Sequence, residues 1–273
     1  MHNERLKEKV HDYWNKASCG TDATKRSKHS REYFEEIEAH RYDIEAQIFS
    51  FAQFTRFKDK KILEVGVGAG TDFLQWVRAG AHAHGIDLTQ EAIDNVKARL
   101  ALYGLQARDL RVADAERLPY PDSYFDCVYS WGVIHHSPNT KQCLAEIVRV
   151  TKPGGIAKVM IYNRCSLFAY YRYWHTAFLK GKPFQKISTV LWNHQESHGT
   201  KAYTLKEVKK MVSKHPVVIK QLKATFEKND YLSLTPRPYQ WLGYVAACLF
   251  GWNKVGWFLT VELQKKEGLR DEQ

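Results

Sequence analysis

The sequence of 273 residues has few cysteines, no internal repeat and no long apolar run. Its five cysteines are scattered and none forms a CxxC pair, which argues against a zinc knuckle or a disulfide framework and predicts free thiols. The charged N-terminus lacks the apolar core of a secretory leader. The most apolar late stretch, residues 241–252, is too short to span a bilayer as a helix. These absences predict a cytoplasmic protein, with contact at a membrane surface left open.

Acidic residues are scarce in one part of the chain. Residues 164–237 contain fourteen Lys and Arg but only four Asp and Glu. This segment therefore holds an excess of ten positive charges, out of a formal net charge of +11 for the whole chain. A basic surface can serve solubility alone, but its concentration in one segment suggests an anionic partner.

Apolar residues, in contrast, are sufficient for a full core, at 44% of the chain. Their periodicity predicts a helix over residues 31–57. Short apolar runs then alternate with amphipathic stretches. The predicted strands are 62–65, a second ending at 84–87, 110–113, 125–130 and 156–162, and the helices are 71–79, 90–102 and 140–150. This alternation is typical of parallel βαβ units in a doubly wound α/β sheet. A helix over 204–212 and strands over 217–224 and 256–261 follow.

A glycine-rich turn ends the first predicted strand. Gly66, Gly68 and Gly70 follow Glu64, and Asp87 stands at the end of the second strand. Glycines let a backbone turn sharply and approach a ligand closely. A carboxylate at the position of Asp87 can accept hydrogen bonds from ribose hydroxyls. The bland alternative is a tight turn without a ligand.

The spacing of these glycines distinguishes between two kinds of cofactor. A nicotinamide cofactor is typically bound by G-x-G-x-x-G, which leaves room for a pyrophosphate at a helix N-terminus. Here the pattern is G-x-G-x-G, and Glu64 stands two residues before the first glycine. A carboxylate facing the cleft repels a pyrophosphate but can orient an ammonium group. The pattern therefore favours a cofactor with a cationic amino-acid tail.

Four blocks within residues 61–163 resemble the class I S-adenosylmethionine-dependent methyltransferases, and most closely their large bacterial small-molecule group, type 11. The blocks are ILEVGVGAGTD, HGIDLT, VADAERLPYPDSYFDCVYSWGVIHH and LAEIVRVTKPGG. The resemblance implies a Rossmann-like, seven-stranded sheet with an antiparallel last strand, and S-adenosyl-L-methionine as cofactor. It also implies four segments: an N-terminal helical flap (1–57), the cofactor-binding core (58–163), an acceptor lid (164–203) and a C-terminal completion of the sheet (204–273).

The resemblance further assigns residues to the parts of the cofactor. They are Glu64 and Gly66 at the methionine, Gly68 and Gly70 in the turn, Asp87 at the ribose, Leu88, Asp114 and Ala115 around the adenine, and Ser130 and Trp131 beside the sulfonium and carboxylate. A side chain of Trp131 over the sulfonium would add a cation–π interaction. For Leu88, Ala115 and Trp131, plain packing in the core is the alternative.

Methyl transfer is a displacement at an activated carbon, so the protein supplies mainly alignment and desolvation. A base is needed only when the acceptor must lose a proton. His135 and His136 follow the fourth strand and are the candidates, with structural hydrogen bonding as the alternative. The displacement needs no metal, so none is predicted. The spacing of His194, Glu196 and His198 would suit a metal site on an extended segment, but a polar lid is the favoured interpretation.

The acceptor is expected at the edge where the fifth strand ends, since ligands of such sheets bind at the carboxyl ends of the strands. The candidate residues are Tyr162, Asn163, Arg164, Arg172, His194 and His198. Aromatic residues alternate with Arg and Lys after residue 164, which suits an acidic or an aromatic and apolar acceptor, or an interfacial helix that binds a lipid.

The sequence thus predicts a methyltransferase acting on a small molecule or lipid precursor. An RNA or protein methyltransferase that uses the basic lid is the main alternative, and a cofactor-binding protein without catalysis is a third. No RNA-binding module is present, and residues 130–133 read Ser-Trp-Gly-Val in place of an Asn-Pro-Pro-Tyr-type motif, which argues against nucleic acid as the partner. The oligomeric state is left open.

Overall fold

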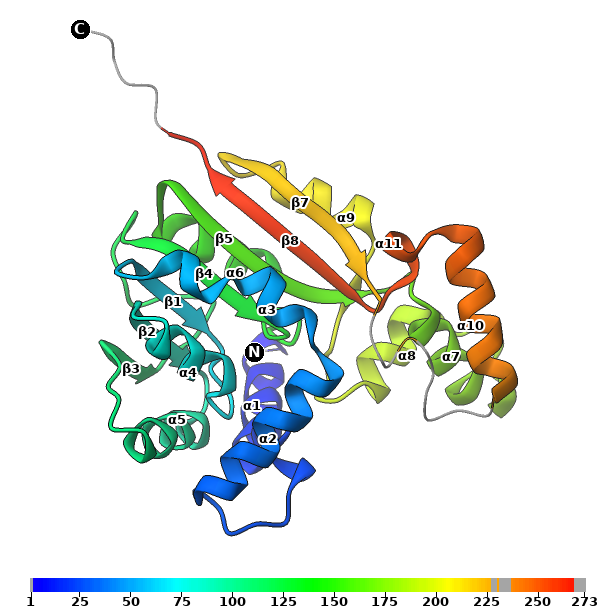
Figure 1. Ribbon diagram of the computed structural model, residues 1–273. Coiled ribbons are helices and arrows are strands. Elements are labelled where there is room, and N and C mark those ends of the chain that lie inside the picture. Colours follow the sequence, from blue (N-terminus) through cyan, green and yellow to red (C-terminus); the bar gives the residue numbers. More distant parts are fainter. Residues whose placement is uncertain (1, 227–229, 231–236, 268–273) are drawn as a thin grey trace, which may run out of the picture.

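A computed structural model describes residues 2–226, 230 and 237–267 of the chain. Its centre is a twisted sheet with the strand order β3-β2-β1-β4-β5-β8-β7 (Figure 1). The strands are β1 (Lys61–Val65), β2 (His82–Asp87), β3 (Asp109–Val112), β4 (Phe125–Trp131), β5 (Thr151–Asn163), β7 (Val217–Thr225) and β8 (Phe258–Lys265). A two-residue strand, β6 (Ala202–Tyr203), pairs with the end of β5.

Strands β1 to β5 run parallel, and β8 lies antiparallel between β5 and β7. The predicted doubly wound sheet with an antiparallel last strand is therefore confirmed. The last strand begins later than expected, at Phe258 rather than at residue 256, and the backbone N–H of Trp257 donates to the Asp230 carboxylate at 2.9 Å. The predicted C-terminal segment 204–273 also includes residues 227–229, 231–236 and 268–273, which lie outside the described part.

Helices cover both faces of the sheet. One face packs against α3 (Gln47–Ala52), α4 (Thr71–Arg78) and α5 (Gln90–Leu102), and the other against α6 (Thr140–Val150) and α9 (Leu205–Val212). Alternate residues of β1 divide between the two cores, because successive side chains of a strand point to opposite faces. Ile62 packs in the first core, whereas Leu63 and Val65 pack in the second. This arrangement leaves the carboxyl ends of the strands for a ligand.

The N-terminal region consists of α1 (His2–Lys16), α2 (Arg31–Ile44), α3 and two 3-10 turns, η1 (Thr21–Ala23) and η2 (Phe54–Phe57). The prediction of one helix over 31–57 is wrong, because the chain is broken twice. Glu45 leaves helical geometry and its carboxylate accepts a hydrogen bond from Trp131 Nε1 at 2.7 Å. Gln53 adopts a left-handed conformation with φ of 58°. Tertiary contact at Glu45 thus overrides the local periodicity.

A separate group of helices lies at one end of the sheet (Figure 1): α7 (Leu167–Thr176), η3 (Phe178–Lys180), α8 (Ile187–His194), α10 (Arg237–Phe250) and α11 (Trp252–Val255). Within the described residues, no helix has the length and apolar character needed to cross a membrane. All five cysteines are free thiols, as predicted.

Candidate functional site

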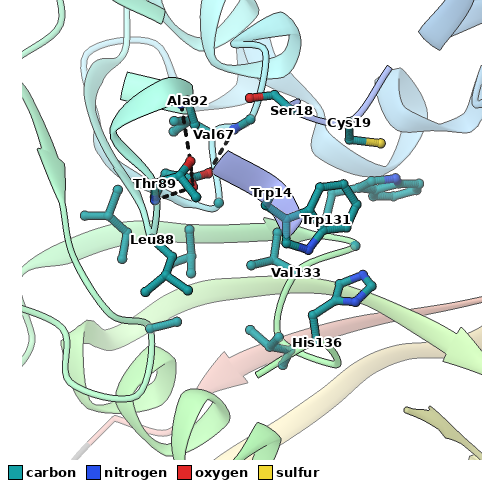
Figure 2. A pocket seen from close by; sticks show the side chains of 18 of the residues that line it. Trp14, Ser18, Cys19, Val67, Leu88, Thr89, Ala92, Trp131, Val133 and His136 are labelled. Carbon is teal, nitrogen blue, oxygen red and sulfur yellow. Dashed lines mark hydrogen bonds between the residues drawn. The ribbon is translucent and has the colours of Figure 1, made fainter. Parts of the chain in front are cut away.

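A cavity of about 170 Å³ lies at the carboxyl ends of β1, β2 and β4. Leu88 and Thr89 line one end of it, and Trp14, Trp131 and His136 line the other (Figure 2). Helix α1 contributes Lys7, Val10 and Trp14 to the wall. The cavity is therefore bounded by the strand ends on one side and by the N-terminal helix on the other.

The glycine-rich turn forms the floor between β1 and α4. Gly66 has φ of 83°, and a Cβ added there would meet Val133 Cγ2 at 2.2 Å. Only glycine fits this position, since both the backbone conformation and the space exclude a side chain. Gly68 also lines the cavity, whereas Gly70, the N-cap of α4 with φ of 75°, does not. Gly70 instead approaches the backbone of Val96, so its role is to pack α4 against α5.

Asp87 lies at the end of β2 and lines the cavity. One carboxylate oxygen accepts from Gly68 N at 3.1 Å, and the other accepts from Thr89 N at 3.0 Å and Thr89 Oγ1 at 2.9 Å. Burial raises the pKa of Asp87, and these backbone and side-chain hydrogen bonds act in the opposite direction. The carboxylate that is predicted to bind the ribose thus also fixes the glycine turn.

Glu64 is buried on β1, and its Oε2 has no hydrogen-bond partner. Burial, and next the charge of Asp72, raise its pKa well above the usual range. Asp72 is fully engaged, because it accepts from Arg41 Nε at 3.0 Å, Arg41 Nη2 at 2.7 Å and the hydroxyls of Tyr42 and Tyr129. Glu64 is therefore the carboxylate that remains available to a ligand in this part of the cavity.

Leu88, Asp114 and Ala115, the residues predicted to surround an adenine, all line the cavity. Here Asp114 Oδ2 accepts from Lys7 Nζ at 2.6 Å, and Lys7 also contacts Glu116 Oε2 at 3.1 Å. Burial acts to lower the pKa of Lys7, but the hydrogen bonds to the two carboxylates outweigh it and raise the pKa. Helix α1 is thus tied by Lys7 to the residue predicted to read the adenine.

Trp131 and Ser130, the two residues predicted beside the sulfonium, differ in placement. Trp131 lines the cavity, packs at 5.6 Å from Phe51 and is held by the Glu45 carboxylate. Ser130 is buried, is absent from the cavity wall, and its Oγ has no partner. The structure therefore places Trp131 within reach of a ligand and Ser130 beneath the wall.

A cluster of polar and aromatic residues forms the end of the cavity beneath Trp131. His136 Nε2 lies 3.2 Å from Glu196 Oε2, and the Tyr162 hydroxyl donates to the same carboxylate at 2.9 and 3.0 Å. Trp14 packs edge-on against the His136 ring at 5.3 Å. Burial acts to raise the pKa of Glu196, but hydrogen bonding and charge from His136 outweigh it and lower the pKa.

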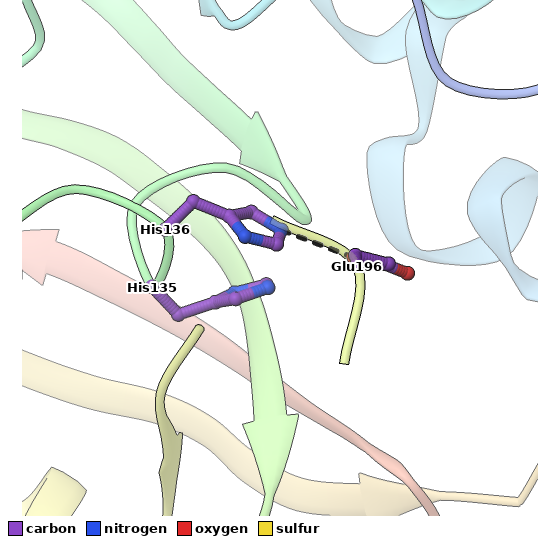
Figure 3. A group of neighbouring side chains, drawn as sticks. All are labelled: His135, His136 and Glu196. Atoms are coloured by element: carbon purple, nitrogen blue, oxygen red, sulfur yellow. Dashed lines mark ion pairs between the residues drawn. The ribbon is translucent and has the colours of Figure 1, made fainter. Parts of the chain in front are cut away.

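His135 lies beside His136 (Figure 3) but is not among the residues that line the cavity. It is fully buried, neither ring nitrogen has a hydrogen-bond partner, and burial lowers its pKa well below the usual value. His135, His136 and Glu196 offer three ligand atoms within 4.8 Å of one another, a spacing that could also hold a metal ion. Of the two histidines predicted as a base, only His136 faces the cavity.

The remaining predicted acceptor residues lie outside the cavity wall. Asn163 is buried and donates to the backbone carbonyls of Lys254 and Gly256. Arg164 pairs with Glu207 at 2.7 Å, and Arg172 donates to the carbonyl of His194. His194 and His198 are exposed, and only Glu196 of that cluster reaches the cavity. The two arginines on which an acidic acceptor was predicted thus serve to hold the lid together.

Several residues of the wall were missed from the sequence. Lys7, Glu45 and Asp72 reach the cavity from α1, from the residue after α2, and from α4. Their positions depend on how the N-terminal helices pack, which no local pattern encodes. Glu196 was noticed only as part of a polar lid. The sequence feature that could have identified Glu196 is that it is a lone carboxylate in a basic segment. Such a charge needs a partner wherever the fold buries it.

The sheet order, the antiparallel last strand and a glycine turn held by the carboxylate of Asp87 define the Rossmann-like class I methyltransferase fold. Comparison with known proteins agrees. Residues 63–159 match the family described as "Methyltransferase domain". The chain thus has the fold of the class I methyltransferases, and its residues 63–159 are similar to a methyltransferase domain.

Relatives in sequence match this domain. One is the phthiotriol/phenolphthiotriol dimycocerosates methyltransferase of Mycobacterium tuberculosis, 41% identical over 98 residues, which are 35% of each chain. An uncharacterised protein of Haemophilus influenzae is 34% identical over 103 residues, 36% of this chain and 41% of that protein. The match thus spans little more than a third of these curated relatives.

Solved structures share the fold over more of the chain. Geranyl diphosphate C-methyltransferase from Streptomyces coelicolor A3(2), solved with Mg²⁺, geranyl diphosphate and S-adenosyl-L-homocysteine, has a TM-score of 0.63 and 15% identity. It covers 95% of this chain and 98% of its own. An S-adenosylmethionine-dependent methyltransferase from Mesorhizobium loti has a TM-score of 0.57 and 15% identity, over 81% and 98% of the two chains. At these identities the likeness concerns the fold alone.

Proposed function

We propose that this protein transfers the methyl group of S-adenosyl-L-methionine to a small-molecule or lipid-precursor acceptor. The observation that carries the proposal is Glu64, a buried carboxylate with an unpartnered oxygen in the wall of the cavity. Burial disfavours ionisation of this carboxyl in the free protein, and a ligand with a cationic group would provide the partner that its ionised form lacks. The domain match and the glycine turn beside Glu64 support the same cofactor.

The residues present suit this cofactor along the whole cavity. Glu64 would hold the amino group, Asp87 the ribose hydroxyls and Asp114 the adenine amine. Gly66 leaves space where a Cβ would collide with Val133. For the carboxylate of the cofactor, Arg41 is a candidate cation in the same wall, where it pairs with Asp72 at 2.7 Å. An acidic cavity is also unsuited to a pyrophosphate, which argues against a nicotinamide cofactor.

When bound, the cofactor supplies a methyl group activated by a cationic sulfur. The protein's contribution is alignment and exclusion of water. Trp131 is held in one orientation by Glu45 and by Phe51, so it offers a fixed aromatic wall. Helix α1 covers the cavity with Val10 and Trp14. These contacts favour a single geometry between the methyl group and an acceptor atom.

His136 can remove a proton from an acceptor that carries one. Thr200 Oγ1 donates to the Ser197 carbonyl at 2.7 Å, so it is free to accept from His136 Nδ1 at 3.0 Å. Ser197 Oγ also lies 2.9 Å from Nδ1 and can donate to it, so these hydroxyls accommodate either tautomer of the neutral ring. After proton transfer from the acceptor to His136, the carboxylate of Glu196 beside Nε2 stabilises the imidazolium.

The test is methyl transfer from radiolabelled cofactor into fractionated cell extract, preceded by calorimetry with S-adenosylhomocysteine and NADH. We expect binding of S-adenosylhomocysteine, no binding of NADH, and label in the small-molecule or lipid fraction. Label in RNA or protein would favour the alternative class of acceptor. Cofactor binding without label in any fraction would indicate a binding protein without catalysis, and either result would contradict the proposal.

A further inference from the structure

The lid carries an exposed apolar surface, which we call the lid tip and define as residues 170–186. Tyr170, Trp174 and Phe178 follow one another at helical spacing along α7 and into η3, and all three are exposed. Leu179 is 58% exposed and Phe184 is 99% exposed. A folded chain gains nothing from leaving such a group of large apolar side chains in water, and a contiguous patch of this kind marks an interaction site.

The lid tip is an ordered structure. Trp174 and Phe178 stack with ring centroids 4.2 Å apart and planes at 12°. Gly181 turns the chain with φ of 72°, and the Tyr173 hydroxyl donates to the Pro183 carbonyl. These contacts fix the loop that carries Phe184 against α7. The apolar side chains are thus held in an outward position.

The charge of the lid tip has one sign. Lys180, Lys182 and Lys186 are exposed around Leu179 and Phe184. Residues 164–195 contain no Asp or Glu, so the lid tip has no carboxylate of its own to neutralise them. An apolar centre with a ring of lysines is the composition of protein surfaces that lie in the headgroup region of a bilayer.

Helix α10 extends the apolar character of this end of the molecule. It lies beside α7 (Figure 1), and a Cβ added at Gly243 would be in ordinary van der Waals contact with Leu167 Cδ1, at 3.8 Å. Residues 238–250 contain no charged side chain. Trp241, Leu249 and Phe250 are all exposed. The helix is therefore a second apolar surface on the same group of helices.

We propose that the lid tip binds the surface of an anionic lipid bilayer, with Leu179 and Phe184 in the apolar boundary and the three lysines at the level of the phosphates. A bilayer supplies an anionic layer directly above an apolar one, which matches both features of the lid tip. A second copy of this chain fits less well. In a two-fold contact the lysines would face each other without carboxylates between them.

The lid tip belongs to the same lid that forms part of the acceptor end of the cavity. After α8 the same lid contributes Glu196 to the acceptor end of the cavity, and Arg172 of α7 holds the carbonyl of His194. Docking at a membrane would therefore bring the acceptor end to lipid-borne molecules. The assignment of a lipid-borne acceptor rests on the proposed function, whereas the membrane binding does not.

The experiment is co-sedimentation of the full chain with vesicles of phosphatidylcholine alone or mixed equally with phosphatidylglycerol. We expect binding to the mixed vesicles that weakens with salt, and much weaker binding to the neutral ones. Each lysine at the surface contributes about fivefold, so loss of the three positive charges costs on the order of 100-fold in partitioning, and K180E/K182E/K186E, which also adds three negative charges, is expected to lose at least that much. Phe184→Ser should lose about tenfold, the value of one buried aromatic side chain.

The matched control is K206E/K209E/K210E, which makes the same change in net charge with three exposed lysines of α9. It should keep most of the binding. Tryptophan fluorescence should shift to the blue with mixed vesicles, and Trp174→Phe should reduce the shift. Equal loss in both triple variants, or no binding of the parent, overturns the proposal. The proposal is also overturned if K180E/K182E/K186E or Phe184→Ser changes the oligomeric state from dimer to monomer and leaves vesicle binding unchanged. None of these results depends on methyl transfer, so failure here leaves the cofactor proposal intact.

Discussion

His136 Nε2 lies 3.2 Å from Glu196 Oε2, and this pair joins the turn after β4 to the segment after α8. The contact places a potential base and a carboxylate that stabilises its protonated form at the acceptor end of the cavity. The pair is fixed further by Tyr162, which donates to Glu196, and by Thr200 at the other nitrogen of the ring. The two residues lie far apart in the sequence, so their contact could not be predicted from it.

Replacing Glu196 by Gln is expected to lower the rate of methyl transfer by about 10²–10⁴-fold, the usual contribution of general base catalysis, while cofactor affinity changes little. Single-turnover transfer from labelled cofactor and calorimetry separate the two quantities. His198→Asn, which alters an exposed histidine two residues away, serves as the control and should keep the rate. An unchanged rate in Glu196→Gln would mean that the acceptor loses no proton to this pair.

Cofactor affinity should depend on pH through Glu64. Burial raises the pKa of this carboxyl in the free protein, while the cationic amino group of the cofactor requires the ionised form. Binding should therefore release a proton, and affinity should rise with pH up to the raised pKa and then level off. Calorimetry in buffers of different ionisation enthalpy measures the proton release. Glu64→Gln should abolish it and weaken binding by about 10–150-fold. Proton release that persists in this variant would assign the titration to another group.

Asp87→Ala is expected to weaken cofactor binding by about 1.5–3 kcal/mol, the range for lost hydrogen bonds to a charged group. Asp87 also accepts from Gly68 N and Thr89, so part of the loss should come from a looser glycine turn. Comparison with Asp87→Asn, which keeps one acceptor oxygen, separates the two causes. Wild-type affinity in a folded alanine variant would show that this carboxylate does not hold the ribose.

Lys7→Met should speed both association and dissociation of the cofactor by several-fold, because Lys7 ties α1 to Asp114 across the cavity. Stopped-flow fluorescence with S-adenosylhomocysteine measures both rates. Lys9→Met removes an exposed lysine of the same helix and is the control. If both variants exchange cofactor at the parent rate, the pair does not limit entry to the cavity.

Exhaustive chelation should leave methyl transfer at full rate, since displacement at an activated methyl group needs no Lewis acid. The prediction is worth testing because His135, His136 and Glu196 could hold a divalent ion. Metal analysis of the purified protein before and after chelation accompanies the assay. Loss of activity that a divalent ion restores, and that disappears in His135→Ala, would replace the base assigned to His136 with a metal centre.

Local patterns in the sequence specify the sheet and the cofactor end of the cavity. Short β-rich runs, the glycines with φ above zero and the N-cap at Thr89 depend on neighbouring residues, so Gly66, Asp87 and the strand ends could be placed in advance. The blocks that resemble known methyltransferases cover this same part, which is also where the family match lies.

Only tertiary packing determines which residues form the acceptor end of the cavity. Arg164 and Arg172 stand soonest after β5 and so were expected beside the methyl group, yet both are used to hold the lid. Glu196 itself adopts a left-handed conformation after α8, with φ of 53°, and its side chain reaches His136 at the cavity. Lys7 reaches Asp114 only because α1 folds over the strand ends. Such contacts join distant segments, and their energies depend on burial and charge in the folded state, which no local pattern contains.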